Sequence, residues 1–120
     1  MNWAPFGEAE LAKMIDARVD VMEAPDRALW NLIRVPQVKW QLHPWGDESG
    51  GFWVVGIIGR QVVWYNDIED GFNVSRYDAA GEIAEYWCNQ DELNHAMRAL
   101  LSQIELGEAP GRLGPPEPLK

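Results

Sequence analysis

The side chains that could do chemistry are few in this sequence of 120 residues, and they lie far apart. Its two histidines are His43 and His95, and Cys88 is its single cysteine. These residues could build a nucleophilic or metal site only if folding brought them together beside an acidic side chain. Within one loop, His43 with Asp47 and Glu48 would supply an acid–base group.

Sequence signatures of other chemistry are missing. The chain has no Gly-rich phosphate loop, no paired-His helix motif, no Cys pair and no Gly-x-Ser-x-Gly elbow. Residues 67–71 resemble the start of a calcium loop, but the glycine falls at the fifth position instead of the sixth, and the twelfth position is Asp78 instead of Glu. We therefore expect no catalytic residue, no cofactor and no metal ion, and we rank an enzyme last of three candidate functions.

The charge of the chain is strongly acidic and unevenly distributed. The formal net charge is −9, and residues 78–95 hold five acidic residues and no Lys or Arg. Nucleic acids and anionic membranes are bound by clustered Lys and Arg, so we expect neither as a partner. A protein with a basic surface is the natural complement of this chain. The alternative left open is that the acidity only keeps the protein soluble.

The composition is that of one folded domain. Apolar residues make up 47% and charged residues 24%, close to average globular usage. The longest apolar run, residues 52–59, is far shorter than the ~20 residues that cross a bilayer. The start of the chain carries no secretory signal pattern, and a lone cysteine fits a reducing compartment, so a cytoplasmic location is expected. The seven tryptophans are the unusual feature, because Trp is enriched in cores and in binding hot spots.

Three helices are predicted from the spacing of apolar residues. Residues 8–23 carry apolar side chains at three- and four-residue spacing, which is typical of an amphipathic helix. Pro25 suits the first turn of a shorter helix over residues 26–34, which Pro36 ends. The last helix follows a capping-box pattern from Asn89 to Glu92 and ends at Gly107.

Between the second and third helices the sequence predicts an antiparallel meander. Residues 38–42 alternate apolar and polar side chains, as in a half-buried strand. Segments 52–58 and 61–67 flank Gly59-Arg60, which predicts a tight hairpin in which Val55 pairs with Trp64. A three-residue loop ending at a left-handed Gly71 then leads to the next strand. A fifth strand is expected at about residues 82–88, although its facing stays open.

Helices with one apolar stripe must cover one face of such a sheet. We therefore predict an α+β fold, a two-layer sandwich in which an antiparallel meander of four to five strands carries the N-terminal helix, the short second helix and the C-terminal helix on one face. Residues 1–107 form this single domain. Residues 108–120 are rich in Pro and Gly and are expected to be a loosely ordered tail.

The predicted register assigns side chains to the two faces of the sheet. The face toward the helices holds Trp53, Val55, Ile57, Val62, Trp64, Ile68, Phe72 and Val74. The reverse face holds Asn73 and Ser75 together with Phe52, Val54, Val63, Tyr65, Asp67 and Tyr77. This reverse face is more apolar than a solvated surface needs to be, so either another element covers it or it binds a partner.

The first candidate function is therefore a small non-enzymatic interaction protein, such as an inhibitor or an immunity-type protein, that binds a basic macromolecular partner. Its candidate partner-binding residues are Phe52, Val54, Val63, Tyr65, Asp67, Tyr77, Glu82 and Glu85. The alternative is a small-molecule-binding domain, with a pocket walled by Trp40, Trp45 and Trp53 around the loop at residues 44–51.

Overall fold

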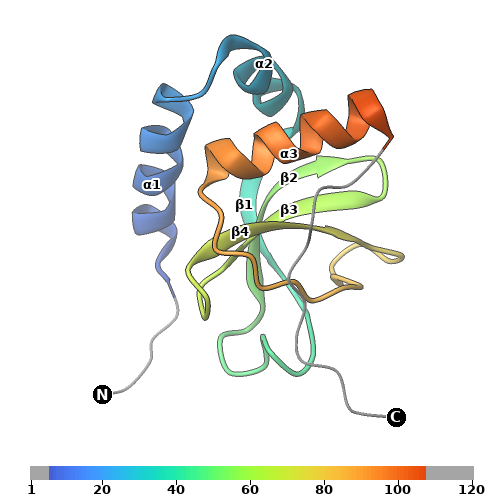
Figure 1. Ribbon diagram of the computed structural model, residues 1–120. Helices are drawn as coiled ribbons and strands as arrows, with labels where there is room; N and C mark the ends of the chain where they lie inside the picture. Colours follow the sequence, from blue (N-terminus) through green and yellow to red (C-terminus); the bar gives the residue numbers. More distant parts are fainter. Residues whose placement is uncertain (1–5, 108–120) are drawn as a thin grey trace.

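The computed structural model describes residues 6–107 and confirms the predicted α+β fold (Figure 1). In chain order its elements are α1 (Glu8–Asp20), α2 (Ala24–Ile33), β1 (Arg34–Trp40), β2 (Phe52–Ile58), β3 (Gln61–Asn66), β4 (Gly71–Arg76) and α3 (Leu93–Leu106). The strands form one antiparallel meander in the order β1-β2-β3-β4. The tail predicted at residues 108–120 lies outside the described residues.

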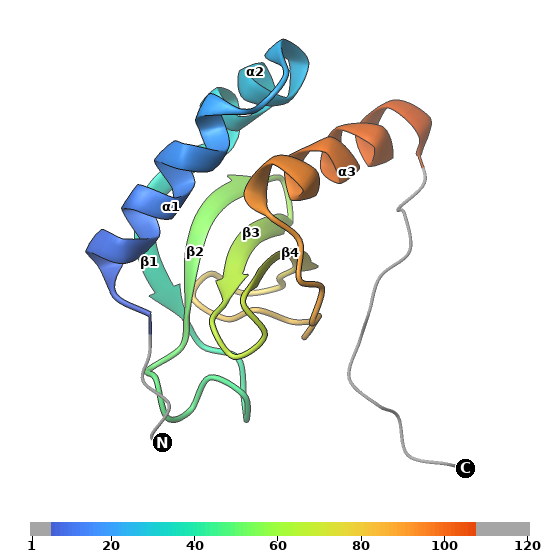
Figure 2. The same cartoon turned by 60° about the vertical axis from the view of Figure 1, so that its left-hand side comes forward.

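The helices lie together on one side of the sheet. Figure 1 shows α2 and α3 above the strands, with α1 standing beside them, and Figure 2 shows the same arrangement from another side. The fifth strand expected at residues 82–88 does not form. Residues 77–92, which we call the covering segment, instead cross the other side of the sheet without regular secondary structure. They form isolated bridges from Glu82 to Gln41 and from Asp91 to Phe72.

The hairpin between β2 and β3 has the predicted turn, but its register changes partway along. Ile58 pairs with Gln61 and Ile57 pairs with Val62, as predicted. A β-bulge between Val54 and Gly56 then shifts the pairing by one residue, so that Val54 faces Trp64. The predicted pairing of Val55 with Trp64 is wrong, because the pattern of apolar residues does not reveal where a bulge inserts its extra residue.

The connection from β3 to β4 is one residue longer than predicted. Asn66 pairs with Gly71, so residues 67–70 form the turn, and Asp70 takes the left-handed conformation (φ 56°) expected for Gly71. The side-chain oxygen of Asn66 accepts the amide hydrogens of Ile68 and Glu69 at 3.1 and 3.2 Å. This local Asx bond stabilises the longer turn.

These two changes of register move side chains to the opposite face of the sheet, since successive residues of a strand alternate. The core under the helices includes Val63 and Tyr65, which were predicted on the reverse face. Trp64 and Val62, predicted under the helices, lie in a second core on the other face. The members of this second core are Trp40, Leu42, Phe52, Val54, Val62, Trp64 and Ile83. Both faces of the sheet are therefore buried.

The helix ends follow the sequence pattern in two of three cases. Pro25 lies in the first turn of α2, and Gly107 closes α3 in the left-handed conformation (φ 73°), both as predicted. The capping box at residues 89–92 is wrong, because α3 begins at Leu93 with Glu92 at the N-cap and no side-chain cap. Asn89 lies before the helix and belongs to the covering segment.

Candidate functional site

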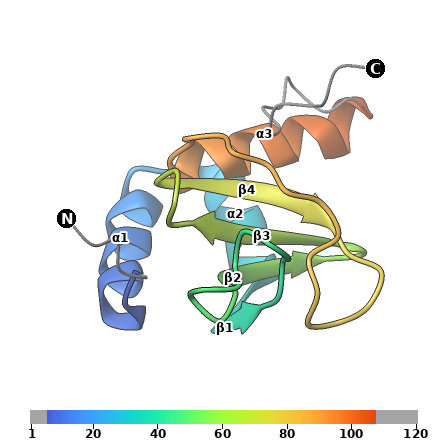
Figure 3. The ribbon, with the colours of Figure 1, turned by 90° about the horizontal axis from the view of Figure 1, so that it is seen from below.

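The apolar residues proposed to bind a partner are not on the surface. Phe52 and Val54 are 1% and 0% exposed and lie in the second core, while Val63 and Tyr65 are buried under the helices. The expected exposed aromatic face is therefore wrong, and the alternative, that another element covers the reverse face, is what the structure shows. The surface on this side of the molecule consists of the covering segment and the loop at residues 41–51 (Figure 3).

Buried polar side chains of β3 and β4 hold the covering segment in place. The Ser75 hydroxyl donates to the carbonyl of Glu85 at 2.8 Å and accepts from the Trp64 indole at 2.8 Å. Asn66 Nδ2 donates to the carbonyl of Trp87 at 3.1 Å. These polar residues within the strands were visible in the sequence. Because buried polar groups need hydrogen-bond partners, they indicate that a further segment packs against this face.

The covering segment also hydrogen-bonds to the β4 edge of the sheet and to Gln41, the residue after β1. Directly after β1, the Gln41 amide donates to the carbonyl of Gly81 and the Ile83 amide donates to the carbonyl of Gln41, both at 2.8 Å. At the β4 edge, the Ala84 amide donates to the carbonyl of Arg76 at 2.9 Å, and the Phe72 amide donates to the carbonyl of Asp91 at 2.8 Å. An edge strand covered in this way is a poor template for pairing with another chain.

The loop at residues 41–51 has a defined shape fixed by its own backbone. The Gly46 amide donates to the carbonyl of Leu42, and the Gly51 amide donates to the carbonyl of Gly46, both at 2.8 Å. The Lys39 ammonium donates to the carbonyl of Ser49 at 2.6 Å and ties the loop to β1. We expect side chains on this loop to be presented in a preorganised position.

Trp45, on this loop, stacks on Tyr86 of the covering segment. The ring centroids are 4.2 Å apart and the planes differ by 12°. Tyr86 is half-buried, accepts a hydrogen bond from Asn66 Nδ2 at 2.9 Å and touches the ring of Trp64 in the second core. Trp45 is 37% exposed. The stack thus extends from the core to the surface, and we call Trp45 and Tyr86 the aromatic stack.

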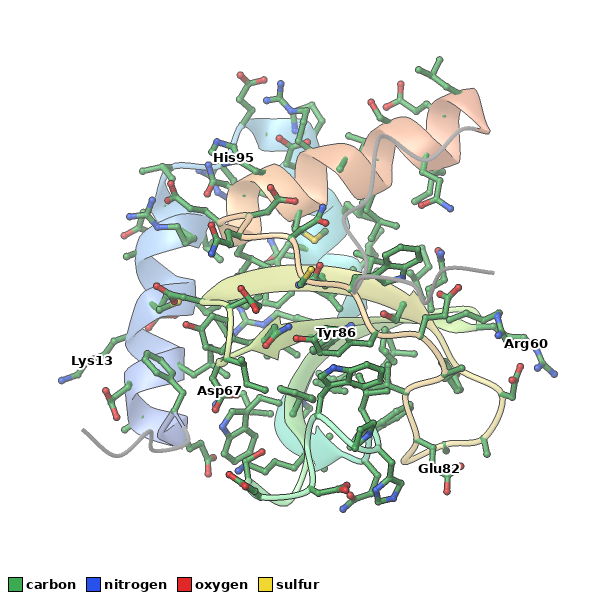
Figure 4. The ribbon with its side chains drawn as sticks, turned by 60° about the horizontal axis from the view of Figure 1, so that its bottom comes forward. Lys13, Arg60, Asp67, Glu82, Tyr86 and His95 are labelled. Atoms are coloured by element: carbon green, nitrogen blue, oxygen red, sulfur yellow. The ribbon has the colours of Figure 1, made fainter. Side chains whose placement is uncertain are left out.

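The surroundings of the aromatic stack are acidic. Residues 41–51 contain two acidic residues, the turn 67–70 three and the covering segment five, and none of these segments contains Lys or Arg. Figure 4 shows Tyr86 near the centre of this side, with Asp67 and Glu82 on either side of it. The pKa of Tyr86 is raised by burial and by the nearby carboxylates of Glu69 and Asp67. Asp78 is paired with Arg76 and Arg60, and the remaining carboxylates leave an excess of acidic residues around the stack.

The remaining proposed partner-binding residues differ in their surroundings. Tyr77 is a structural residue, because its ring meets Trp40 edge-on at 5.1 Å and its hydroxyl donates to the carbonyl of Gly59. A carboxylate oxygen of Glu85 accepts the Arg76 amide hydrogen at 2.7 Å. Glu82 is exposed beside the 41–51 loop.

Asp67 is half-buried and accepts the Phe6 amide hydrogen at 2.9 Å. Burial raises the pKa of this carboxyl group, while the hydrogen bond from Phe6 acts in the opposite direction. Its position at the turn between β3 and β4 links the start of the described chain to the sheet.

The three tryptophans proposed to line a pocket do not lie together. Trp40 is buried in the second core, whereas Trp53 packs against the core on the helix face and donates its indole hydrogen to the carbonyl of Phe6 at 2.9 Å. The Trp-lined pocket is therefore wrong in its choice of residues. A groove of about 510 Å³ does exist between α1 and β1, and Trp30 is the one tryptophan among its lining residues.

The side chains considered for chemistry are also dispersed. His43 Nδ1 pairs with the Asp47 carboxylate in the exposed loop, while His95 lies on α3 beside a separate cavity of about 270 Å³. Within residues 6–107, no group of three or more His, Cys, Asp or Glu side chains is close enough to hold a metal ion. The helices of this part of the chain are too short and too polar to cross a lipid bilayer.

Comparison with known proteins gives no relative from which a function could be transferred. No protein-family model, no curated protein and no solved structure matches this chain significantly.

Proposed function

We propose that this protein is a small acidic interaction protein that binds a basic macromolecular partner through the surface around the aromatic stack. This description fits inhibitors and immunity-type proteins, which block a basic enzyme or toxin. We place the protein in the cytoplasm as part of the same proposal, since a fold with the single Cys88 needs no oxidising compartment.

The observation that carries the proposal is an exposed tryptophan held rigidly within an acidic surface. Trp and Tyr dominate binding hot spots because they bury a large area at a low cost in conformational entropy. Trp45 loses little further freedom on binding, because Tyr86 supports one side of its ring and the loop backbone is already hydrogen-bonded. The surrounding carboxylates would speed the encounter with a positively charged surface.

The test is affinity capture from cells that express the protein, with three full-length baits compared side by side. The baits are the wild type, Trp45→Ala and the control Leu32→Ala, which removes an apolar side chain on α2 that is more exposed than Trp45 (83% against 37%). We expect a basic protein to be retained by the wild type and by Leu32→Ala, and to be lost with Trp45→Ala and at high salt. Captured proteins that are acidic, or that bind all three baits equally, would contradict the proposal.

Small-molecule binding is the second candidate, and the groove between α1 and β1 is what favours it. Trp30 lies on the floor of this groove, and its buried indole nitrogen has no hydrogen-bond partner among residues 6–107. A fragment screen followed by NMR would show this function as shifts confined to groove residues such as Ala12 and Gln37.

A further inference from the structure

We propose that the outer face of Trp45 receives an arginine side chain of the partner, whose guanidinium stacks on the indole and donates a hydrogen bond to the Glu48 carboxylate of the same loop. This inference rests on the proposed function and specifies its chemistry. It requires an open aromatic face, carboxylates within reach of that face and a reason to favour arginine over lysine.

The open face follows from the geometry of the aromatic stack. Tyr86 lies parallel to the Trp45 ring at 4.2 Å and occupies its inner face, so the exposed part of Trp45 is the outer face and the rim. The π-electrons of an indole face attract cations, and Trp does so more strongly than Tyr or Phe. Tyr86 is held by Asn66 and by the second core. It therefore blocks the space into which the Trp45 ring would have to turn to bury its outer face.

Carboxylates lie close to Trp45 along the loop. The Asp47 amide donates to the carbonyl of Pro44 at 3.2 Å, which folds residues 44–47 into a tight turn with Trp45 inside it. Glu48 follows directly, is exposed and forms no ion pair with any residue of the described chain. Asp47 is paired with His43, so Glu48 is the carboxylate available to a partner.

Lys39, a basic side chain hydrogen-bonded to this loop, does not fill this position. The Lys39 ammonium is committed to the carbonyl of Ser49 and lies 5.1 Å from the ring of Trp53, a residue of the other core. No Lys or Arg among residues 6–107 lies over the Trp45 ring, so the proposal takes this cation from another molecule.

Arginine suits this surface better than lysine. A guanidinium is planar, so it can cover the indole face while its N–H groups point sideways toward a carboxylate at the rim. An ammonium ion is more strongly hydrated and cannot make both contacts with the same planar geometry. Within the described residues the guanidinium of Arg34 makes a contact of this kind, 5.4 Å from the ring of Trp30.

The experiment is an NMR titration of the ¹⁵N-labelled full-length protein with three short synthetic peptides that differ at one position. The peptides carry arginine, lysine or citrulline, the last being a neutral group with the shape of arginine. The reporter is the indole N–H resonance of Trp45, assigned with a Trp45→Phe variant. We expect saturable shifts with the arginine peptide, binding of the lysine peptide weaker by about threefold or more, and no saturation with citrulline.

Two variants test the assigned contacts. For the variants the binding is followed by the backbone amide resonances of the loop at residues 41–51, since Trp45→Ala removes the indole reporter. We expect Trp45→Ala to weaken arginine-peptide binding by about tenfold and Glu48→Gln by about threefold, while Glu105→Gln on α3 leaves it unchanged. Equal binding of the arginine and lysine peptides, or no movement of the Trp45 resonance at peptide concentrations on the order of 10 mM, would overturn the inference.

The failure of the inference can be told apart from the failure of the proposed function. A basic partner that is lost with Trp45→Ala, together with equal binding of the arginine and lysine peptides, would leave the proposed function in place but remove the arginine contact. If neither a basic protein nor the arginine peptide binds, both proposals are wrong.

Discussion

The side chain of Asn73 pairs with the main chain of Asn89 as a neighbouring strand would. Its oxygen accepts the Asn89 amide hydrogen at 3.0 Å, and its nitrogen donates to the Asn89 carbonyl at 3.1 Å. The two residues are 16 positions apart, and Asn73 is buried. Through this bond a strand of the sheet fixes a segment that has no regular structure of its own, and that segment carries Tyr86.

Asn73→Ala should lower the free energy of unfolding by about 2–3 kcal/mol, because it removes both side-chain hydrogen bonds from the buried Asn73 to the partly buried main chain of Asn89. Urea unfolding followed by tryptophan fluorescence measures this loss. The matched control is Asn31→Ala on the exposed side of α2, which should change stability by no more than about 0.5 kcal/mol. Equal effects of the two substitutions would show that the Asn73 bonds contribute nothing to the fold.

Asn89→Ala should cost clearly less than Asn73→Ala, since the Asn89 main chain is what Asn73 holds and alanine keeps that main chain. The Asn89 side chain donates to the Asp91 carboxylate at 3.1 Å and does not cap α3. We expect a loss of about 0.5–1 kcal/mol and an unchanged helix content by circular dichroism. A loss of helix signal would instead support the capping box predicted from the sequence.

Trp64→Ala should cost about 3–5 kcal/mol, because the side chain is fully buried in the second core and leaves a cavity. Trp45→Ala is the control within the same aromatic group, and it should cost about 1 kcal/mol, since Trp45 loses its contact with Tyr86 but is partly exposed. Urea unfolding of both variants gives the comparison. If Trp45→Ala were the more destabilising of the two, the stack would be a structural element and not a surface for a partner.

The order and type of the elements could be predicted from the sequence because they depend on local patterns. Apolar residues at helical spacing placed all three helices, Pro25 marked the start of α2, and Gly59-Arg60 marked the hairpin. Registers could not be predicted in full. The bulge beside Val55 shifts the β2–β3 pairing by one residue, and the longer turn with the Asx bond of Asn66 shifts the β3–β4 pairing by three. Neither changes the apolar pattern that was used to choose the register.

The candidate site was harder to predict, because loops that contact one another only in the folded chain build it. Trp45 and Tyr86 are 41 positions apart in irregular segments, and nothing in the spacing of either indicates the stack. Because of the register changes, Tyr65 lies under the helices and Trp64 lies in the second core, each on the face opposite to the predicted one. The buried polar residues Asn66, Asn73 and Ser75 were the available signal that the reverse face is covered.

Asp67 should make the protein less stable as the pH rises through the range in which it titrates. Burial raises its pKa in the folded protein above the ordinary value near 3.8, so the folded state holds the proton more tightly than the unfolded state. Between the two pKa values the folded state binds more protons, and the free energy of unfolding therefore falls with increasing pH.

The variant Asp67→Asn removes this dependence and keeps an oxygen that can accept the Phe6 amide hydrogen. We expect the stability of Asp67→Asn relative to the wild type to increase as the pH is raised from about 3 to about 6, measured by urea unfolding at each pH. Asp16→Asn, on the exposed side of α1, controls for the loss of one charge. A difference that stays constant with pH would show that burial of Asp67 has no net effect.

Gly51→Ala should disrupt the loop that presents Trp45, for two reasons that act together. The backbone of Gly51 has φ 110°, which side chains other than glycine rarely adopt, and an added Cβ would lie 2.2 Å from the Trp40 carbonyl oxygen, where neither backbone can yield. Gly59→Ala separates these causes, since Gly59 also has a positive φ (56°) but nothing lies within 4 Å of its added Cβ.

We expect urea unfolding to show a loss of about 1 kcal/mol for Gly59→Ala and about 2–4 kcal/mol for Gly51→Ala. In NMR spectra the Trp45 indole resonance should shift in the Gly51 variant and stay in place in the Gly59 variant. Equal losses at the two glycines, with the Trp45 resonance unmoved in both, would mean that the close approach to Trp40 does not fix the loop.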